Sequence, residues 1–198
     1  MFSIILYNEL KTSSQNLNKI IASFLFFIIF IFIANLLQQN SQYPINDNII
    51  FWLALSCVAI FSSYDFLKSE YENGMLEQMI IACYNFEIFI FAKIICNWIN
   101  YCLPIIIATY LINRNIDFIA TAIIATFIIN VICCFCGSFS LLGNSSPLIA
   151  IIALPLIIPT IILSQNSSLV WQILLPLGFF CFFLLSFLIA KIAKIILE

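Results

Sequence analysis

Acidic side chains gather in the segment from Asp65 to Lys93. Acidic groups in water can bind a basic surface on a partner. The chain has seven basic and nine acidic residues, and this segment holds two of the basic and five of the acidic ones, a net charge of −3 (2 − 5). Such a charge is complementary to a partner with a basic groove. A solvated loop whose charges only keep it out of the membrane fits these residue types equally well. The charged residues are Asp65, Lys68, Glu70, Glu72, Glu77, Glu87 and Lys93.

Several kinds of chemistry lack the residues they need. The chain has no histidine, so no imidazole can bind haem iron or act as a general base. It has no G-x-x-x-x-G-K-[ST] for a bound ATP. Its apolar blocks contain no carboxylate or amine to carry a coupling ion, which disfavours secondary transport, and no acid pair or Ser-Lys pair for hydrolysis. We expect a non-catalytic chain that binds no metal or cofactor and takes its energy from a partner.

The eight cysteines include one C-x-x-C, formed by Cys133 and Cys136. This spacing could serve a redox pair or half of a metal site. Most of the cysteines lie in apolar blocks, however, where a free thiol behaves as a small buried hydrophobe and an apolar site keeps it protonated. We assign them no thiol chemistry.

Six apolar blocks make up most of the chain, which is 64% hydrophobic and 8% charged. At about 1.5 Å per residue, each block approaches the roughly 30 Å thickness of bilayer hydrocarbon. None shows the alternation of a barrel strand. We expect an all-α membrane protein with six transmembrane helices in a single domain over residues 1–198, because the connecting loops are too short for another domain. The blocks are Ile20–Leu37, Ile49–Tyr64, Ile94–Ile112, Phe118–Phe139, Pro147–Leu163 and Ile173–Ala190.

The basic residues predict how the chain is oriented. With a cytoplasmic N-terminus, all six lysines fall on the inner side and only Arg114 on the outer side, as the positive-inside rule requires. Both termini are then cytoplasmic. The first block lacks a small-x-small cleavage site, which indicates a retained anchor rather than a signal peptide.

The segment 65–93 is expected to form two helices with a turn at Asn73-Gly74. One face would lie on the membrane, while Glu70, Glu72, Glu77 and Gln78 face the cytoplasm. The third span could begin before Ile94, with Lys93 reaching to the headgroups. Residues 1–19 predict an interfacial helix; a frayed tail is the alternative.

Prolines and asparagines mark the interior of the spans. Pro104 lies midway along the third span, and Pro155 and Pro159 predict a kinked or broken fifth span. These prolines are candidates for a gating break or are ordinary membrane-helix prolines; the sequence favours neither. Asn97, Asn100 and Asn130 are the polar residues of interest, with an interhelical hydrogen bond favoured over a substrate contact.

The order of these elements resembles a known family. The motif Tyr71-Glu72-x-Gly74-x-Leu76-Glu77-Gln78, with Ala92-Lys93, Trp98, Leu103-Pro104 and Leu154-Pro155-x-x-x-Pro159 downstream, is similar to that of the CcmB family, haem exporter protein B of cytochrome c maturation.

The resemblance implies a type-2 ABC transporter permease in the bacterial inner membrane, or the mitochondrial inner membrane as an alternative. Two copies would assemble with two copies of a separate ATPase and with haem-handling membrane subunits, and the complex would release a haem-loaded periplasmic chaperone. ATP and haem would bind in those partner subunits. The resemblance makes 65–93 the segment that couples to the ATPase, through Glu72, Gly74, Leu76, Glu77 and Gln78. A type-2 permease exporting another lipid, a polysaccharide or a drug, and a non-transporting membrane scaffold for haem-handling subunits, are the alternatives.

Overall fold

A computed structural model describes residues 5–7, 9–11, 17–39, 47–64, 66–82, 86–112, 116–142, 146–165 and 170–197. Within these ranges the protein is helical and no residue belongs to a strand. The elements are α2 (Leu17–Gln39), α3 (Asp47–Ser63), α4 (Lys68–Glu72), α5 (Met75–Ala82), α6 (Phe86–Asn97), η1 (Trp98–Cys102), α7 (Leu103–Ile112), α8 (Ile116–Ser138), η2 (Phe139–Leu142), α9 (Ser146–Ser164), η3 (Val170–Leu174) and α11 (Leu175–Leu197).

Five helical stretches are long and apolar enough to cross a membrane, which confirms a multi-pass, all-helical membrane protein. They are Asn18–Leu37, Ile49–Glu72, Phe86–Tyr110, Phe118–Leu141 and Val170–Leu197. The predicted fifth span corresponds to α9, whose described apolar part, Ile149–Ser164, is shorter. Six spans and cytoplasmic termini therefore stay predictions. The third span does begin early, at Phe86.

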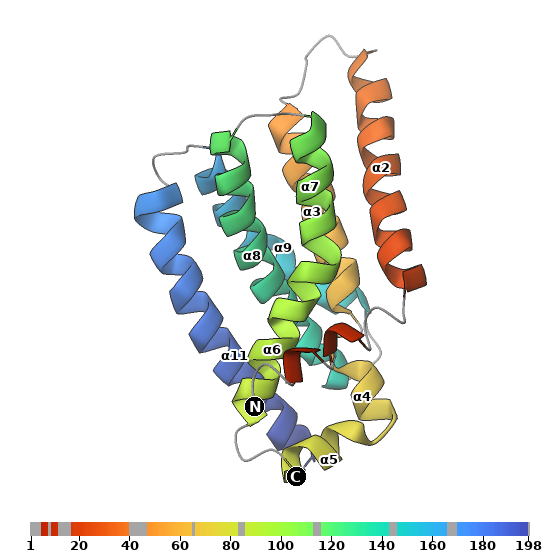
Figure 1. Cartoon of the computed structure of the whole chain (residues 1–198), viewed down its shortest axis with the longest axis vertical. Coiled ribbons are helices and arrows are strands. Elements are labelled where there is room, and N and C mark those ends of the chain that lie inside the picture. The colour runs from red at the N-terminus through yellow and green to blue at the C-terminus, as the bar shows by residue number, and fades with distance from the viewer. Residues whose placement is uncertain are drawn as a thin grey trace.

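Helix α8 lies at the centre of the bundle and packs against α3, α9 and α11 (Figure 1). Its buried positions include small side chains, such as Ala122, Ala125 and Cys133. Small residues let neighbouring membrane helices approach closely. Because α8 has neighbours on several sides, its sequence has no single apolar stripe.

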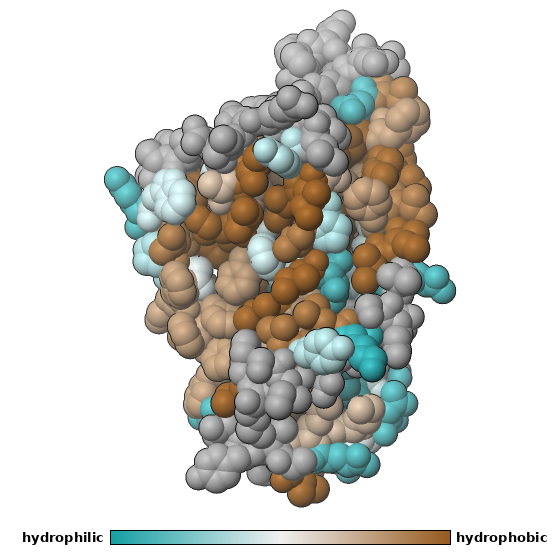
Figure 2. All heavy atoms as spheres, viewed as in Figure 1, coloured by the Kyte–Doolittle hydropathy of each residue, from teal (hydrophilic) through white to brown (hydrophobic). Residues whose placement is uncertain are grey.

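Helix α2 lies at the edge of the bundle. Only 6% of its apolar stretch is buried. The helix packs mainly on α3. Figure 2 shows hydrophobic side chains over its outer surface, whereas hydrophilic ones gather toward the α4–α5 end. Lipid or another protein must cover α2, since water cannot.

Two helices change to a π-helical turn just before a proline. In η1 the N–H of Leu103 donates to the carbonyl of Trp98, five residues back, and Pro104 follows; η3 precedes Pro176 in the same way. A proline ring collides with the carbonyl four residues earlier and has no N–H to donate. Those carbonyls belong to Asn100 and Gln172, inside the two π turns, where the wider helix gives them room.

The fifth span was predicted to be kinked or broken, and it is not broken, because α9 continues as an α-helix through Pro155 and Pro159. A kink there stays a prediction. Both prolines are exposed, and so is Ile151, whose carbonyl the first ring would displace. Crowding on an outer helix face can be relieved without ending the helix.

Candidate functional site

The predicted helix–turn–helix of the charged segment is confirmed. Helices α4 and α5 lie at the same end of the bundle as the last turns of α11 and the described helical residues 5–7 and 9–11 (Figure 1). Between α4 and α5, Gly74 has φ +68°, a left-handed conformation that suits glycine. The N–H of Gly74 donates to the carbonyl of Tyr71 at 3.1 Å, which closes the turn.

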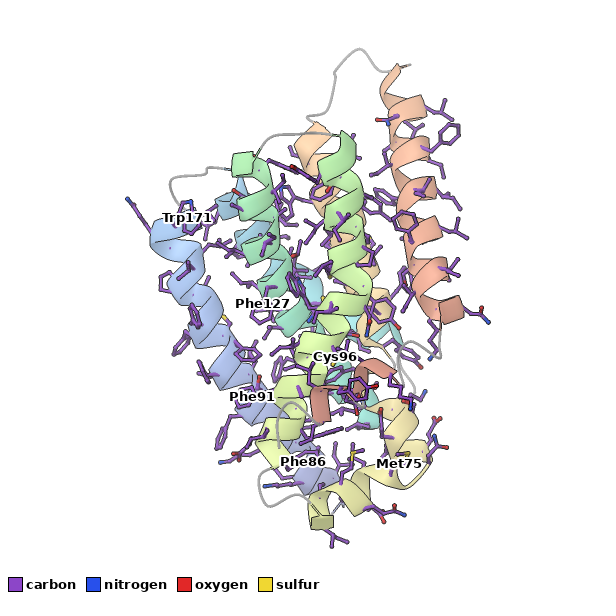
Figure 3. The ribbon with its side chains drawn as sticks, viewed as in Figure 1. Met75, Phe86, Phe91, Cys96, Phe127 and Trp171 are labelled. Atoms are coloured by element: carbon purple, nitrogen blue, oxygen red, sulfur yellow. The ribbon has the colours of Figure 1, made fainter. Side chains whose placement is uncertain are left out.

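One side of this segment is anchored in the bundle. Leu67 and Leu76 are both fully buried, and they belong to the same apolar cluster as Ile90 of α6 and Ala190 of α11. Figure 3 shows Met75 of α5 and Phe86 of α6 at this end of the molecule. A force applied to α5 therefore reaches apolar side chains on two long helices.

The opposite side carries three of the five predicted coupling residues. Glu72, Glu77 and Gln78 are exposed, whereas Leu76 is buried and Gly74 forms the turn. The five thus divide into three groups that can touch a partner and two that shape and anchor the segment. Glu70 does not face water as predicted, since its side chain is 18% exposed and pairs with Lys93.

A hollow of about 300 Å³ lies beside Glu77, between α5 and the end of α11. Its wall is apolar apart from one acidic and one basic residue, and it is lined by Glu77, Ile80, Ile81, Lys194 and Leu197. Ile81 is 86% exposed. Helix α5 therefore presents an apolar side chain beside Glu77 and Gln78 at this surface.

The asparagine pair inside the spans confirms the predicted interhelical hydrogen bond. Asn97 of α6 donates to the Oδ1 of Asn130 of α8 at 2.8 Å, and Asn130 donates to the carbonyl of Ile94 at 3.1 Å. Asn130 is fully buried. The two amides therefore join α6 to α8.

A second contact joins the same helices one turn away. The indole N–H of Trp98 donates to the Oγ1 of Thr126 at 3.0 Å. Sequence reasoning missed Thr126, although it precedes Asn130 by four residues and so shares its face of the helix. Asn100 lies half-buried in η1, and Pro104, also half-buried, follows it. The structure does not bring Pro104 together with Pro155 and Pro159 into one gate: the latter two face outward from α9.

The described cysteines are free thiols, and those at 96, 102, 133, 134 and 136 are buried. The Sγ of Cys134 accepts a hydrogen bond from Asn97 at 3.5 Å, so this thiol contributes to the α6–α8 contact. Among the residues that the structure describes, no three acidic, histidine or cysteine side chains are placed to hold a metal ion.

Replacing Gly74 by alanine tests the turn on its own. A Cβ at this position meets nothing within 4 Å, so the cost comes from φ alone and is about 1 kcal/mol. We expect Gly74→Ala to insert normally into the membrane and to show reduced coupling to an ATPase. Gly74→Asn should restore the coupling, because asparagine tolerates this conformation better. Equal effects of the two residues would show that the turn conformation is not what matters.

None of the curated proteins matches the chain. A family profile described as CcmB protein does match, and the match extends over residues 1–195 of the 198. The elements it covers include the charged α4–α5 segment, the asparagine pair and every described helix up to the last turn of α11. The chain therefore belongs to the CcmB family.

Proposed function

We propose that this chain is the membrane permease subunit of an ABC complex for cytochrome c biogenesis, and that it couples to a separate ATPase through residues 65–93. The CcmB family suggests a non-catalytic permease subunit for haem export in cytochrome c maturation. The observation that supports coupling at this segment is its two-sided construction: Leu76 is fully buried while Glu72, Glu77 and Gln78 are exposed.

In this proposal the exposed side enters a groove of the ATPase, with acidic groups against basic ones. Closure of the ATPase pair around nucleotide then displaces α5. Because Leu76 packs with residues of α6 and α11, the displacement shifts these helices between two packed arrangements. In this proposal ATP and haem iron bind to partner subunits. Both termini and the α4–α5 segment lie on the cytoplasmic side of a bacterial inner membrane.

A second copy of the chain would complete the permease. The outer faces of α2 and α9 are exposed and apolar, with Phe32 62% and Ile151 70% exposed. Such faces suit lipid or another membrane helix. The proposed homodimer would bury part of this surface.

Charge reversal at Glu77 tests the coupling assignment. The chain is expressed with its genomic neighbours, purified in detergent, and the copurified ATPase is quantified per permease. We expect Glu77→Lys to reduce ATPase affinity roughly tenfold, about 1.4 kcal/mol, and Glu77→Gln to have a smaller effect. Gln172→Lys is the matched control, since it adds a lysine at an exposed position in η3, at the opposite end of the bundle, beside Trp171 (Figure 3).

The same purification separates the alternatives. Recovery of an ATPase with haem-handling subunits, together with loss of c-type cytochromes on deletion, supports the proposal. An ATPase without haem proteins indicates export of another substrate, and no ATPase indicates a scaffold. If Glu72→Lys, Glu77→Lys and Gln78→Ala all bind the ATPase like the wild type, the coupling segment is wrongly assigned.

A further inference from the structure

Lys93 is a buried charged residue, with 8% of its surface exposed. It lies in α6, and its ammonium points to α4; its position relative to the headgroups stays a prediction. Its Nζ forms an ion pair with the Oε1 of Glu70 in α4. A buried lysine without a partner would be several kcal/mol unfavourable.

Two aromatic rings enclose this ion pair. The Nζ of Lys93 is 5.6 Å from the ring centroid of Phe66, just before α4, and 5.6 Å from that of Phe89, one turn earlier in α6. Both rings are almost completely buried. They provide cation–π contact and exclude water, so the attraction between Lys93 and Glu70 is screened far less than at a surface.

A third charged group approaches from the N-terminal residues. Burial raises the pKa of Glu9, the nearby Lys93 opposes that rise, and Glu70 adds to it. The carbonyl of Leu6 accepts a hydrogen bond from the thiol of Cys96 in α6 at 3.6 Å. Figure 3 shows Cys96 beside this N-terminal ribbon. The residues around Glu9 therefore pack against α6 next to the ion pair.

Helix α4 is connected to α6 by this ion pair. It has five residues and none of them is buried. Lys68 of α4 contacts the hydroxyl of Tyr64 at 3.0 Å and Glu72 at 3.9 Å, both within four residues of it along the chain. The bond from Glu70 to Lys93, in contrast, connects α4 to a long helix.

Lys93 lies in α6 shortly before the residue that contacts α8. Asn97 follows Lys93 by four residues, so the two side chains share one face of the helix. Lys93 holds α4, Asn97 holds α8 through Asn130, and the π turn η1 begins at the next residue. A displacement of α4 therefore acts on α6 one turn before the Asn97–Asn130 contact with α8 and before the π turn η1.

We propose that the Lys93–Glu70 ion pair is the joint through which movement of the α4–α5 segment reaches the third span, with Lys93 and Glu70 as positioning residues. This inference rests on the proposed coupling to an ATPase. It adds a charged connection between α4 and α6 to the apolar contacts around Leu76.

The test follows helix movement rather than activity. Spin labels on genetically encoded ketone residues replace Ile107 of α7 and Phe179 of α11, both exposed, so the native cysteines stay unlabelled. The label distance is measured in the purified complex with and without vanadate-trapped nucleotide. We expect the wild type to change its distance, the Glu70→Met, Lys93→Met double variant to lose the change, and the Glu70→Lys, Lys93→Glu exchange to regain it.

Two controls make the result specific. Replacing a buried ion pair by apolar residues is often neutral for stability, so the double methionine variant should fold and bind the ATPase as the wild type does. Lys191→Met removes another lysine that lies over an aromatic ring, 4.8 Å from the centroid of Phe187 on the exposed surface of α11, and should keep the distance change. A full change in the Glu70→Met, Lys93→Met variant, or no recovery in the exchanged pair, would overturn the joint. Absence of the ATPase from the wild-type preparation would overturn the proposed function and this inference with it.

Discussion

Replacing Gly137 by alanine is expected to lower the free energy of unfolding by about 3 kcal/mol, an overpacking effect. A Cβ on Gly137 in α8 would lie 2.1 Å from the backbone carbonyl oxygen of Ser63, at the end of α3. Backbone cannot rotate away as a side chain can, so α3 and α8 must separate. Exchange of glycine for alanine inside a helix would otherwise stabilise by about 1 kcal/mol, which is too little to offset the collision.

The effect should extend to the charged segment. The carbonyl of Ser63 accepts the N–H of Phe66 at 3.1 Å, and Phe66 covers the ion pair of Lys93. Displacing that carbonyl therefore disturbs the start of α4 as well as the bundle. Tryptophan fluorescence during unfolding by sodium dodecyl sulfate measures the stability, and copurified ATPase measures the coupling.

Gly178→Ala is the matched control. Gly178 is also a buried helical glycine, in α11, but its added Cβ would meet only side-chain atoms of Ile128, at 3.1 and 3.3 Å. A side chain can shift by a few tenths of an ångström, so this variant should be close to the wild type in stability. Similar losses in both variants would mean that helix crowding in general, rather than the Ser63 carbonyl, sets the effect.

Replacing Asn130 by leucine is expected to cost about 2 kcal/mol, because two groups of α6 lose their hydrogen bond to its buried amide. These are the side-chain amide of Asn97 and the carbonyl of Ile94. Thr126→Val removes a single acceptor, that of the Trp98 indole, and should cost about 0.6 kcal/mol, a typical value for one hydrogen bond between membrane helices.

A double-mutant cycle identifies the origin of the loss. The Asn97→Leu, Asn130→Leu variant removes both amides together, so it should be more stable than the sum of the single variants predicts. The same unfolding titration measures all three. Strict additivity would show that the asparagines contribute independently and that their hydrogen bond adds nothing to the α6–α8 contact.

The sequence was sufficient for features that depend on local composition. Long apolar blocks predicted the helices, Asn73-Gly74 predicted the turn, and Asn97 and Asn130 were expected to bond between helices because a lone amide is unfavourable in hydrocarbon. Each of these follows from residue type and neighbours along the chain. The separation of buried Leu76 from exposed Glu77 also follows from helical spacing, once the helix is placed.

Features that depend on the packing of distant segments could not be predicted. Glu70 and Lys93 are separated by a turn and parts of three helices, so nothing in their spacing pairs them. The close approach at Gly137 depends on a carbonyl 74 residues earlier (137 − 63). Pro155 and Pro159 were expected to kink or break α9, but whether a proline ring meets a neighbour or open surface is decided by which face it occupies.

The contrast between α2 and the third span sets an order for how the chain enters the membrane. Helix α2 has a mean hydropathy of 2.9 and few contacts within the chain, so its own hydrophobicity is enough for the translocon to release it into lipid. The span Phe86–Tyr110 is less hydrophobic, at 1.7, and it carries Asn97, whose partner Asn130 is synthesised 33 residues later. We therefore expect the third span to stay near the translocon until α8 emerges and Asn97 can pair with Asn130.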